Sequence, residues 1–131
     1  MSHFTRVQTQ ISDLVILEEA LHQLSCEFQT GDNLTINGYQ NDTENAQVVI
    51  RTGGRYDIGL QLQDDHSYAI SADWWGVKRT SGINREEFIN KLNRTYAHLA
   101  IKRQIIEQGL IIEEEKVLEN GEIELVLSEP V

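Results

Sequence analysis

Short segments in which apolar and polar residues alternate run through the chain, and this period of two is typical of half-buried β-strands. In residues 57–63, Ile58, Leu60 and Leu62 alternate with less apolar neighbours. Four turn-forming residues separate this segment from residues 68–74, so we expect the two to be adjacent antiparallel strands. Further strands are expected at residues 3–10, 26–29, 47–52, 110–118 and 122–127.

Leucines in residues 14–25 recur at intervals of three and four, which indicates an amphipathic helix, and Ser12 or Asp13 can cap it. The stretch from residue 32 to residue 47 is instead rich in Asn, Gly and Asp. We expect turns or an excursion there, with a strand around residues 34–39. The sequence assigns no role to this Asn-rich stretch.

A second helix is expected to start after Asn84, which pairs with Glu87 as in a capping box, and to end near Gln108 with Gly109 as its left-handed cap. An Asn-Gly dipeptide at residues 120–121 then marks a hairpin between the last two strands. The predicted order is β-α-β-β-β-β-α-β-β. This order indicates an α+β fold, an antiparallel sheet with two helices packed on one face.

The chain has 131 residues, the length of one ordinary domain, so we expect a single α+β domain over residues 1–131. No apolar run approaches the roughly 18 to 20 residues that span a bilayer. The N-terminus lacks the basic and apolar regions of a signal peptide, which predicts a soluble, cytoplasmic protein. Cys26 is the single cysteine, so an internal disulfide and a cysteine-built metal site are excluded.

Charge is spread unevenly along the chain. The net charge is −8 in residues 1–73, +5 in residues 74–106 and −7 in residues 107–131, which sums to −10. The overall charge argues against nucleic acid as a partner, because a polyphosphate backbone is repelled. The basic segment either neutralises the acidic sheet beside it or offers a local patch to a small anion or an acidic partner.

The second helix carries a basic stripe on the side opposite its predicted core face. The core face includes Leu92, Leu99 and Ile106. Two isoleucines lie among the basic residues, and they are either isolated exposed side chains or part of a surface for a protein partner or a second copy of the chain. The predicted partner-binding residues are Lys91, Arg94, His98, Ile101, Lys102 and Ile105.

Two adjacent tryptophans, Trp74 and Trp75, follow Asp73 at the end of the central strands. If the strand continues through them, their side chains point to opposite faces, so one is buried and the other must find a helix, a loop or a ligand. Both rings can also serve only as packing. A ligand pocket is the alternative to partner binding, formed between the sheet and Trp74, Trp75 and Tyr96, with His98 or Asp73 as polar groups.

Recognisable catalytic motifs are scarce. Residues 52–55 lack the Lys-Ser/Thr ending of a phosphate-binding loop, and Cys26 has no activating neighbour in sequence, so we expect it to be structural. Glu18 and His22 have a spacing that can hold a metal, but such a pair is more often a surface contact. The sequence therefore predicts no catalytic residue, no metal site and no cofactor, although it does not decide whether the protein is an enzyme.

Several motifs, in order along nearly the whole chain, resemble the hypothetical chloroplast reading frame 35 family of cyanobacteria and algal plastids. The resemblance implies a cyanobacterial cytoplasm or plastid stroma, and it implies no reaction, cofactor or catalytic residue. It also suggests ferredoxin-like and ATPase-type proteins as neighbours, and hence a ferredoxin-like protein partner, whereas an acidic partner is expected from the basic stripe of the second helix. The motifs are Met1-Ser2-His3-Phe4-Thr5, Ile11-Ser12-Asp13-Leu14, Tyr56-Asp57-Ile58-Gly59-Leu60, Ala72-Asp73-Trp74-Trp75-Gly76-Val77, Tyr96-Ala97-His98, and the final hairpin from Gly109-Leu110 to Asn120-Gly121.

Two classes of function follow from these observations. The favoured one is a non-catalytic accessory or binding protein that acts through protein–protein contact, because the second helix has an apolar and basic outer face and catalytic motifs are missing. The alternative is a small enzyme or ligand-binding domain with its pocket near the two tryptophans. A flat exposed patch around Ile101 and Ile105 would favour the binding protein, and a buried, strongly shifted Asp73 or His98 would favour the enzyme.

Overall fold

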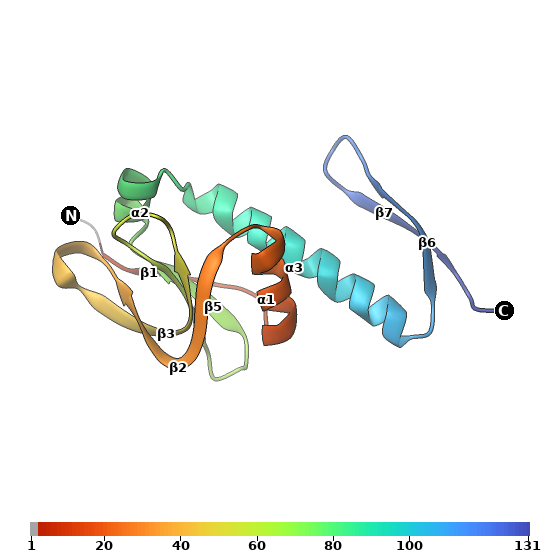
Figure 1. Cartoon of the computed structure of the whole chain (residues 1–131), viewed down its shortest axis with the longest axis horizontal. Helices are drawn as coiled ribbons and strands as arrows, with labels where there is room; N and C mark the ends of the chain where they lie inside the picture. The colour runs from red at the N-terminus through yellow and green to blue at the C-terminus, as the bar shows by residue number, and fades with distance from the viewer. Residues whose placement is uncertain (1–2) are drawn as a thin grey trace.

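The computed structural model describes residues 3–131, so Met1 and Ser2 of the first motif lie outside it. Its main feature is a five-stranded antiparallel sheet in the order β1-β5-β4-β3-β2 (Figure 1). The predicted α+β class is confirmed. The strands are β1 (Thr5–Gln8), β2 (Glu27–Asn37), β3 (Thr43–Arg51), β4 (Ile58–Leu62) and β5 (Tyr68–Ala72).

Strands β4 and β5 form the predicted antiparallel pair in the middle of the sheet. Leu60 pairs with Ile70, and Ile58 pairs with Ala72. Both strands are buried almost throughout, and these four side chains have no exposed surface. Alternation in the sequence indicated one dry face, but neighbouring elements cover both faces here.

Helices α1 (Leu14–Gln23) and α3 (Arg85–Glu107) pack on one face of the sheet. Both predicted caps are present, because the carboxylate of Asp13 accepts from the amide of Ile16 and the side chain of Asn84 accepts from the amide of Glu87, each at 3.1 Å. The core below the helices is apolar and fully buried; it includes Leu17, Leu21, Val48, Ile58, Leu60, Ile70 and Leu92.

The Asn-rich stretch is mostly regular strand, so the expectation of an excursion is wrong. It forms the far end of the long β2–β3 hairpin, whose register shifts between Thr30 and Leu34 and which turns through a 3-10 helix, η1 (Tyr39–Asn41). Ile36 and Ala46 of this hairpin end are fully buried together with Val49, farther along β3, on the sheet face away from the helices, and this burial explains why a polar sequence stays in the sheet.

A short helix that the sequence pattern did not predict, α2 (Trp74–Ser81), follows β5 directly. The strand therefore ends at Ala72, and the expectation that it extends to Trp74 is wrong. The carboxylate of Asp73 starts the helix by accepting from the amide of Gly76 at 3.2 Å. A Cβ at Gly76 would lie 2.0 Å from the ring of Tyr56, so only glycine lets α2 pack so closely.

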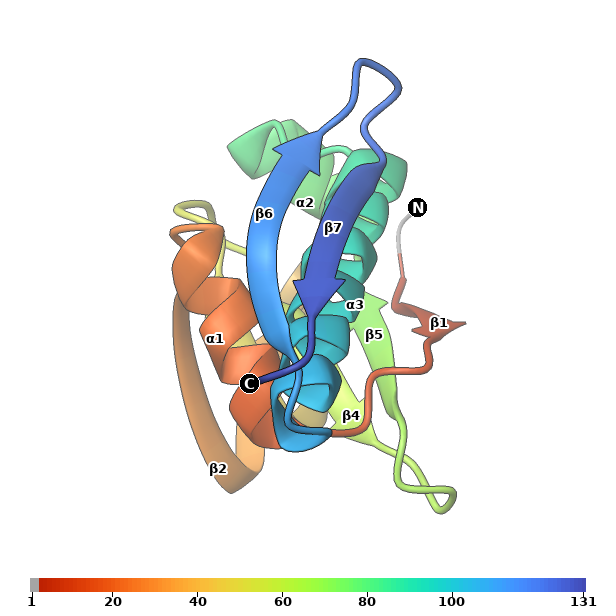
Figure 2. The ribbon, with the colours of Figure 1, turned by 90° about the vertical axis from the view of Figure 1, so that its right-hand side faces the viewer.

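The last two strands, β6 (Ile111–Val117) and β7 (Ile123–Ser128), form a separate antiparallel hairpin. We call residues 110–131 the C-terminal arm. Figure 2 shows that the arm lies over α3 on the side away from the sheet, so the molecule has three layers: sheet, helices and arm. No helix in the described residues is long and apolar enough to cross a membrane.

Candidate functional site

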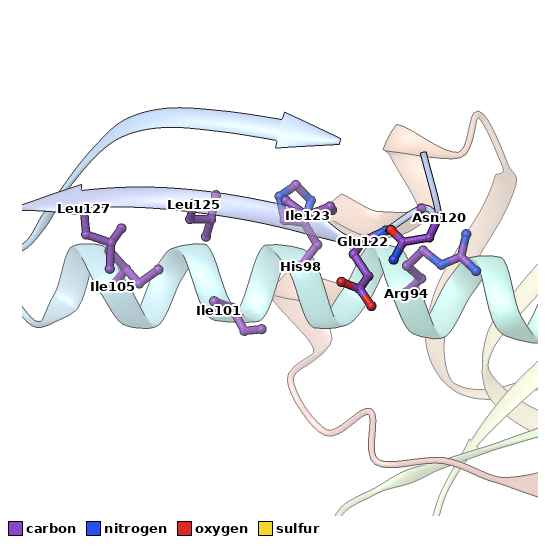
Figure 3. A pocket seen from close by; sticks show the side chains of 10 residues that line it. Arg94, His98, Ile101, Ile105, Asn120, Glu122, Ile123, Leu125 and Leu127 are labelled. Carbon is purple, nitrogen blue, oxygen red and sulfur yellow. The ribbon is translucent and has the colours of Figure 1, made fainter. Parts of the chain in front are cut away.

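A cleft of about 600 Å³ lies between the outer side of α3 and the C-terminal arm (Figure 3). The helix contributes Arg94, His98, Ile101 and Ile105, whose spacing of three and four places them on one side of α3. The arm contributes its hairpin turn and the inner side chains of β7. These arm residues are Asn120, Gly121, Glu122, Ile123, Leu125 and Leu127.

The two walls of the cleft are matched along their length. Figure 3 shows Leu127 over Ile105 at one end and Asn120 and Glu122 beside Arg94 at the other. The cleft is therefore apolar at the end near the start of the arm and polar at the end near the hairpin turn. An occupant would need an apolar part and a polar or charged part in that order.

A single carboxylate links the arm to α3. Glu115 on β6 has one oxygen 2.6 Å from Nε2 of His98 and the other 3.0 Å from Nζ of Lys102. The hydrogen bond from Lys102 lowers the pKa of Glu115, and the charges of Lys102 and His98 lower it further. The arm is thus attached to the helix by charge at β6, while the cleft opens under β7.

Exposed apolar side chains are concentrated in the last part of the chain, and two of them line this cleft. Of the twelve large apolar side chains exposed within residues 3–131, eight belong to residues 101–131. Ile101 is 50% exposed at the cleft, and Leu127 is 42% exposed above it. Exposed apolar side chains that line a cleft are typical of interaction sites in natural proteins.

The structure brings together most of the predicted partner-binding residues. Arg94, His98, Ile101 and Ile105 line the cleft, and Lys102 holds the arm. Lys91 lies apart, beside Cys26 in a cavity of about 500 Å³. The predicted surface is also not free, because the arm covers part of it and leaves Ile105 only 9% exposed.

The prediction of a core face on the second helix is correct only for the part of α3 that covers the sheet. Leu92 is fully buried, but Ile106 is 63% exposed, so its assignment to the core is wrong. Figure 1 gives the reason, since the last turns of α3 extend beyond the sheet. The arm packs on these turns from the opposite side.

The two tryptophans lie on helix α2 and have different surroundings. Trp74 is 8% exposed and packs against Phe88, with ring centroids 6.3 Å apart. Trp75 is 51% exposed, with the guanidinium of Arg79 4.7 Å from its ring centroid and the edge of Tyr39 beside it. They separate as one buried and one exposed ring, but by helical geometry rather than by strand alternation.

Asp73 and Tyr96, the other two predicted ligand residues, bind backbone groups. Buried Asp73 accepts from the amide of Tyr39 at 3.1 Å, besides capping α2. The hydroxyl of Tyr96 accepts from the amides of Ser12 and Asp13 at 3.2 and 3.0 Å and so fixes the start of α1. Tyr96 lines a cavity of about 580 Å³ with residues 8–11 of the N-terminal segment, and neither tryptophan contributes to that cavity.

The other candidate groups, the Cys26 thiol and clusters of metal-ligating side chains, show no sign of a reactive or metal-binding site among the described residues. Burial raises the pKa of Cys26, and the charge of Lys91 opposes this only in part, so the reactive thiolate is disfavoured. Within residues 3–131, no three His, Cys, Asp or Glu side chains gather as a metal site.

Sequence reasoning missed the arm wall of the cleft. Ile123, Leu125 and Leu127 alternate with other residues and so share one face of the hairpin, but nothing local indicated that this face would lie over α3. Glu115 was also missed, since it is one of three consecutive glutamates and only the fold distinguishes it. The signal available was the charge contrast between the basic second helix and the acidic C-terminal segment.

Comparison with known proteins places the chain in a family. A family model described as "Protein of unknown function (DUF1257)" matches residues 20–126. An "Uncharacterized protein ycf35" from Guillardia theta is 33% identical, covering 97% of this chain and 96% of the relative, and one from Cyanophora paradoxa is 30% identical with the same coverage. No solved structure matches the chain significantly. The chain is similar to the plastid ycf35 proteins over nearly their full length, and it thus belongs to the DUF1257 family of proteins of unknown function.

Proposed function

We propose that this chain is a non-catalytic accessory protein of a cyanobacterial cytoplasm or plastid stroma, and that it binds an apolar segment of another protein in the cleft between α3 and the C-terminal arm. The observation that supports this most directly is the half-exposed Ile101 on the helical wall, opposite the apolar side chains of β7. Full burial of an exposed isoleucine contributes about 1.5–3 kcal/mol, so covering the exposed half of Ile101 contributes roughly half as much.

The extent of the apolar surface favours a protein segment over a small ligand. Besides the cleft walls, Ile111 and Val126 are exposed on the outer side of the arm and Val117 near the hairpin turn. A small ligand would cover the cleft alone, whereas a protein partner can cover the arm as well. Interfaces of this kind combine an apolar centre with a polar rim, which Arg94 and Glu122 supply here.

The test is a comparison of two exposed isoleucines of the same helix. Ile101 lies in the cleft and is 50% exposed, and Ile106 lies outside it and is somewhat more accessible, at 63% exposed. The tagged full chain, Ile101→Lys and Ile106→Lys are each used to capture proteins from a photosynthetic extract, and captured proteins are identified and quantified. We expect both variants to fold and only Ile101→Lys to lose a stoichiometric partner.

Two results would contradict the proposal. One is a partner that binds Ile101→Lys as well as it binds the parent chain. The other is loss of the partner with Ile106→Lys alone, which would move the binding surface to the side of α3 that faces α1, where Ile106 lines a cavity with Glu19. Circular dichroism and thermal unfolding of both variants show that the fold is intact in each case.

A further inference from the structure

We propose that the partner segment binds as an extended strand added to the free edge of β7, with apolar side chains turned into the cleft and basic side chains turned to solvent. This inference rests on the proposed function and names the binding mode and the chemistry of the segment. Within residues 3–131, the arm is a two-stranded sheet in which β6 and β7 pair with each other alone. Two strands alone are marginally stable, and each leaves one edge open.

The open edge of β7 can be assigned residue by residue. The amide of Leu118 donates to the carbonyl of Glu122 at 2.8 Å, so these two residues form a hydrogen-bonded pair. Pairs alternate along an antiparallel ladder, which makes Lys116 and Glu124 the next hydrogen-bonded pair. The backbone groups of Ile123 and Leu125 therefore point away from β6, toward the open edge.

The same two residues line the cleft with their side chains. A strand added beside them would continue the inner face of the arm, and its alternate side chains would face α3. Ile101 offers half of its surface there, and the cavity beside Asn93 and Ala97 lies on the next residues of the same helix. Two neighbouring stretches of α3 therefore line cavities on this side of the molecule.

Charge selects a basic segment. The arm carries seven glutamates and one base, Lys116, and Lys116 already pairs within the arm with Glu114 at 3.3 Å. Glu122 at the cleft mouth and Glu124 on β7 have no ion pair among the described residues. Like charges on facing strands are destabilising, so the equally acidic arm of a second copy is a poor neighbour, whereas Lys or Arg side chains would complement this edge.

The test uses the full chain and three synthetic ten-residue peptides as probes. The first alternates Val and Lys, the second alternates Val and Glu, and the third is the Val/Lys peptide with every backbone amide N-methylated, which removes the backbone donors but keeps the charge. Binding is measured by calorimetry at low and physiological salt, and amide exchange of Ile123 and Leu125 is followed by NMR.

We expect only the unmethylated Val/Lys peptide to bind, with weaker affinity at higher salt and at least about tenfold slower exchange of the Ile123 and Leu125 amides. No binding by that peptide, or equal binding by the methylated one, overturns strand addition. Protection of Leu125 in the peptide-free chain together with a dimeric mass also overturns it, in favour of a second copy. If the peptide fails while partner capture still depends on Ile101, the cleft remains the binding site and only the strand mode is lost.

Discussion

The five-stranded sheet and the two-stranded C-terminal arm are held in place by different forces. The sheet is buried on both faces at its centre, where Leu60 and Ile70 have no exposed surface. Strand β6 of the arm has no buried residue, and the arm is attached through the ion pairs of Glu115 and contact with Ile105. We infer from this difference that the sheet and its two packed helices supply most of the free energy of folding. The arm is held weakly, so a partner can stabilise it.

The largest effect that tests this comparison is expected in the core. Leu92 is fully buried on the core side of α3, so Leu92→Ala should lower the free energy of unfolding by about 2–5 kcal/mol. Leu127→Ala removes a similar side chain from the arm, where 42% of its surface is already exposed, and should cost less than about 1.5 kcal/mol. Urea unfolding of both variants measures the difference. Equal losses would mean that the arm folds together with the sheet as one unit.

A smaller effect is expected where α2 packs on the segment before β4. A Cβ at residue 76 would overlap the ring of Tyr56, so Gly76→Ala should cost about 1–3 kcal/mol, even though alanine favours helices. The matched control is the double variant with Tyr56→Ala, in which the overlap is gone and the two effects should be less than additive. Additive losses would show that the contact between Gly76 and Tyr56 does not limit the residue at this position.

The smallest effect on global stability is expected at the attachment of the arm. Glu115→Gln should leave the midpoint of unfolding nearly unchanged but speed amide exchange in β6 and β7, because the arm loses its ion pairs with α3. Glu114→Gln, which removes an ion pair inside the arm, is the control and should not release it. Unchanged exchange in Glu115→Gln would show that apolar contacts alone hold the arm.

The same attachment should depend on pH. The pKa of Glu115 is lowered in the folded chain, first by the hydrogen bond from Lys102. Its ionised form therefore favours the attached arm above the ordinary pKa of 4.5, and this contribution is lost as the pH falls through the lowered pKa. Amide exchange in β6, corrected for its intrinsic pH dependence, should show release of the arm in acid in the parent chain and not in Glu115→Gln.

The sequence predicted the elements whose signals are local. Asp13 and Asn84 cap their helices as expected, and the Asn-Gly dipeptide lies at the tip of the hairpin. Helix α2 was missed because two tryptophans after a strand resemble its continuation, and the deciding contact is the cap by Asp73.

The candidate site was half predictable for the same reason. The helical wall follows from spacing along one helix, so Arg94, His98, Ile101 and Ile105 were found. The opposite wall depends on where the arm folds back, which no local pattern records. Helical periodicity alone assigned Ile106 to the core, but its exposure depends on where the sheet ends beneath α3.

The length of α3 sets the angle at which the arm meets the rest of the molecule. The helix has 23 residues and continues from the sheet to the base of the arm without interruption. Its length therefore sets the distance of the arm from the sheet, and its helical phase sets the side of the helix on which the arm lies. Deleting one residue after Leu92 would rotate the rest of α3 and the arm together by about 100° around the helix axis, so the cleft between them would lie on a different side of the molecule. Inserting seven residues would restore its orientation and move it outward by about 10 Å. Relatives with a changed arm position should therefore differ in α3 by whole numbers of turns.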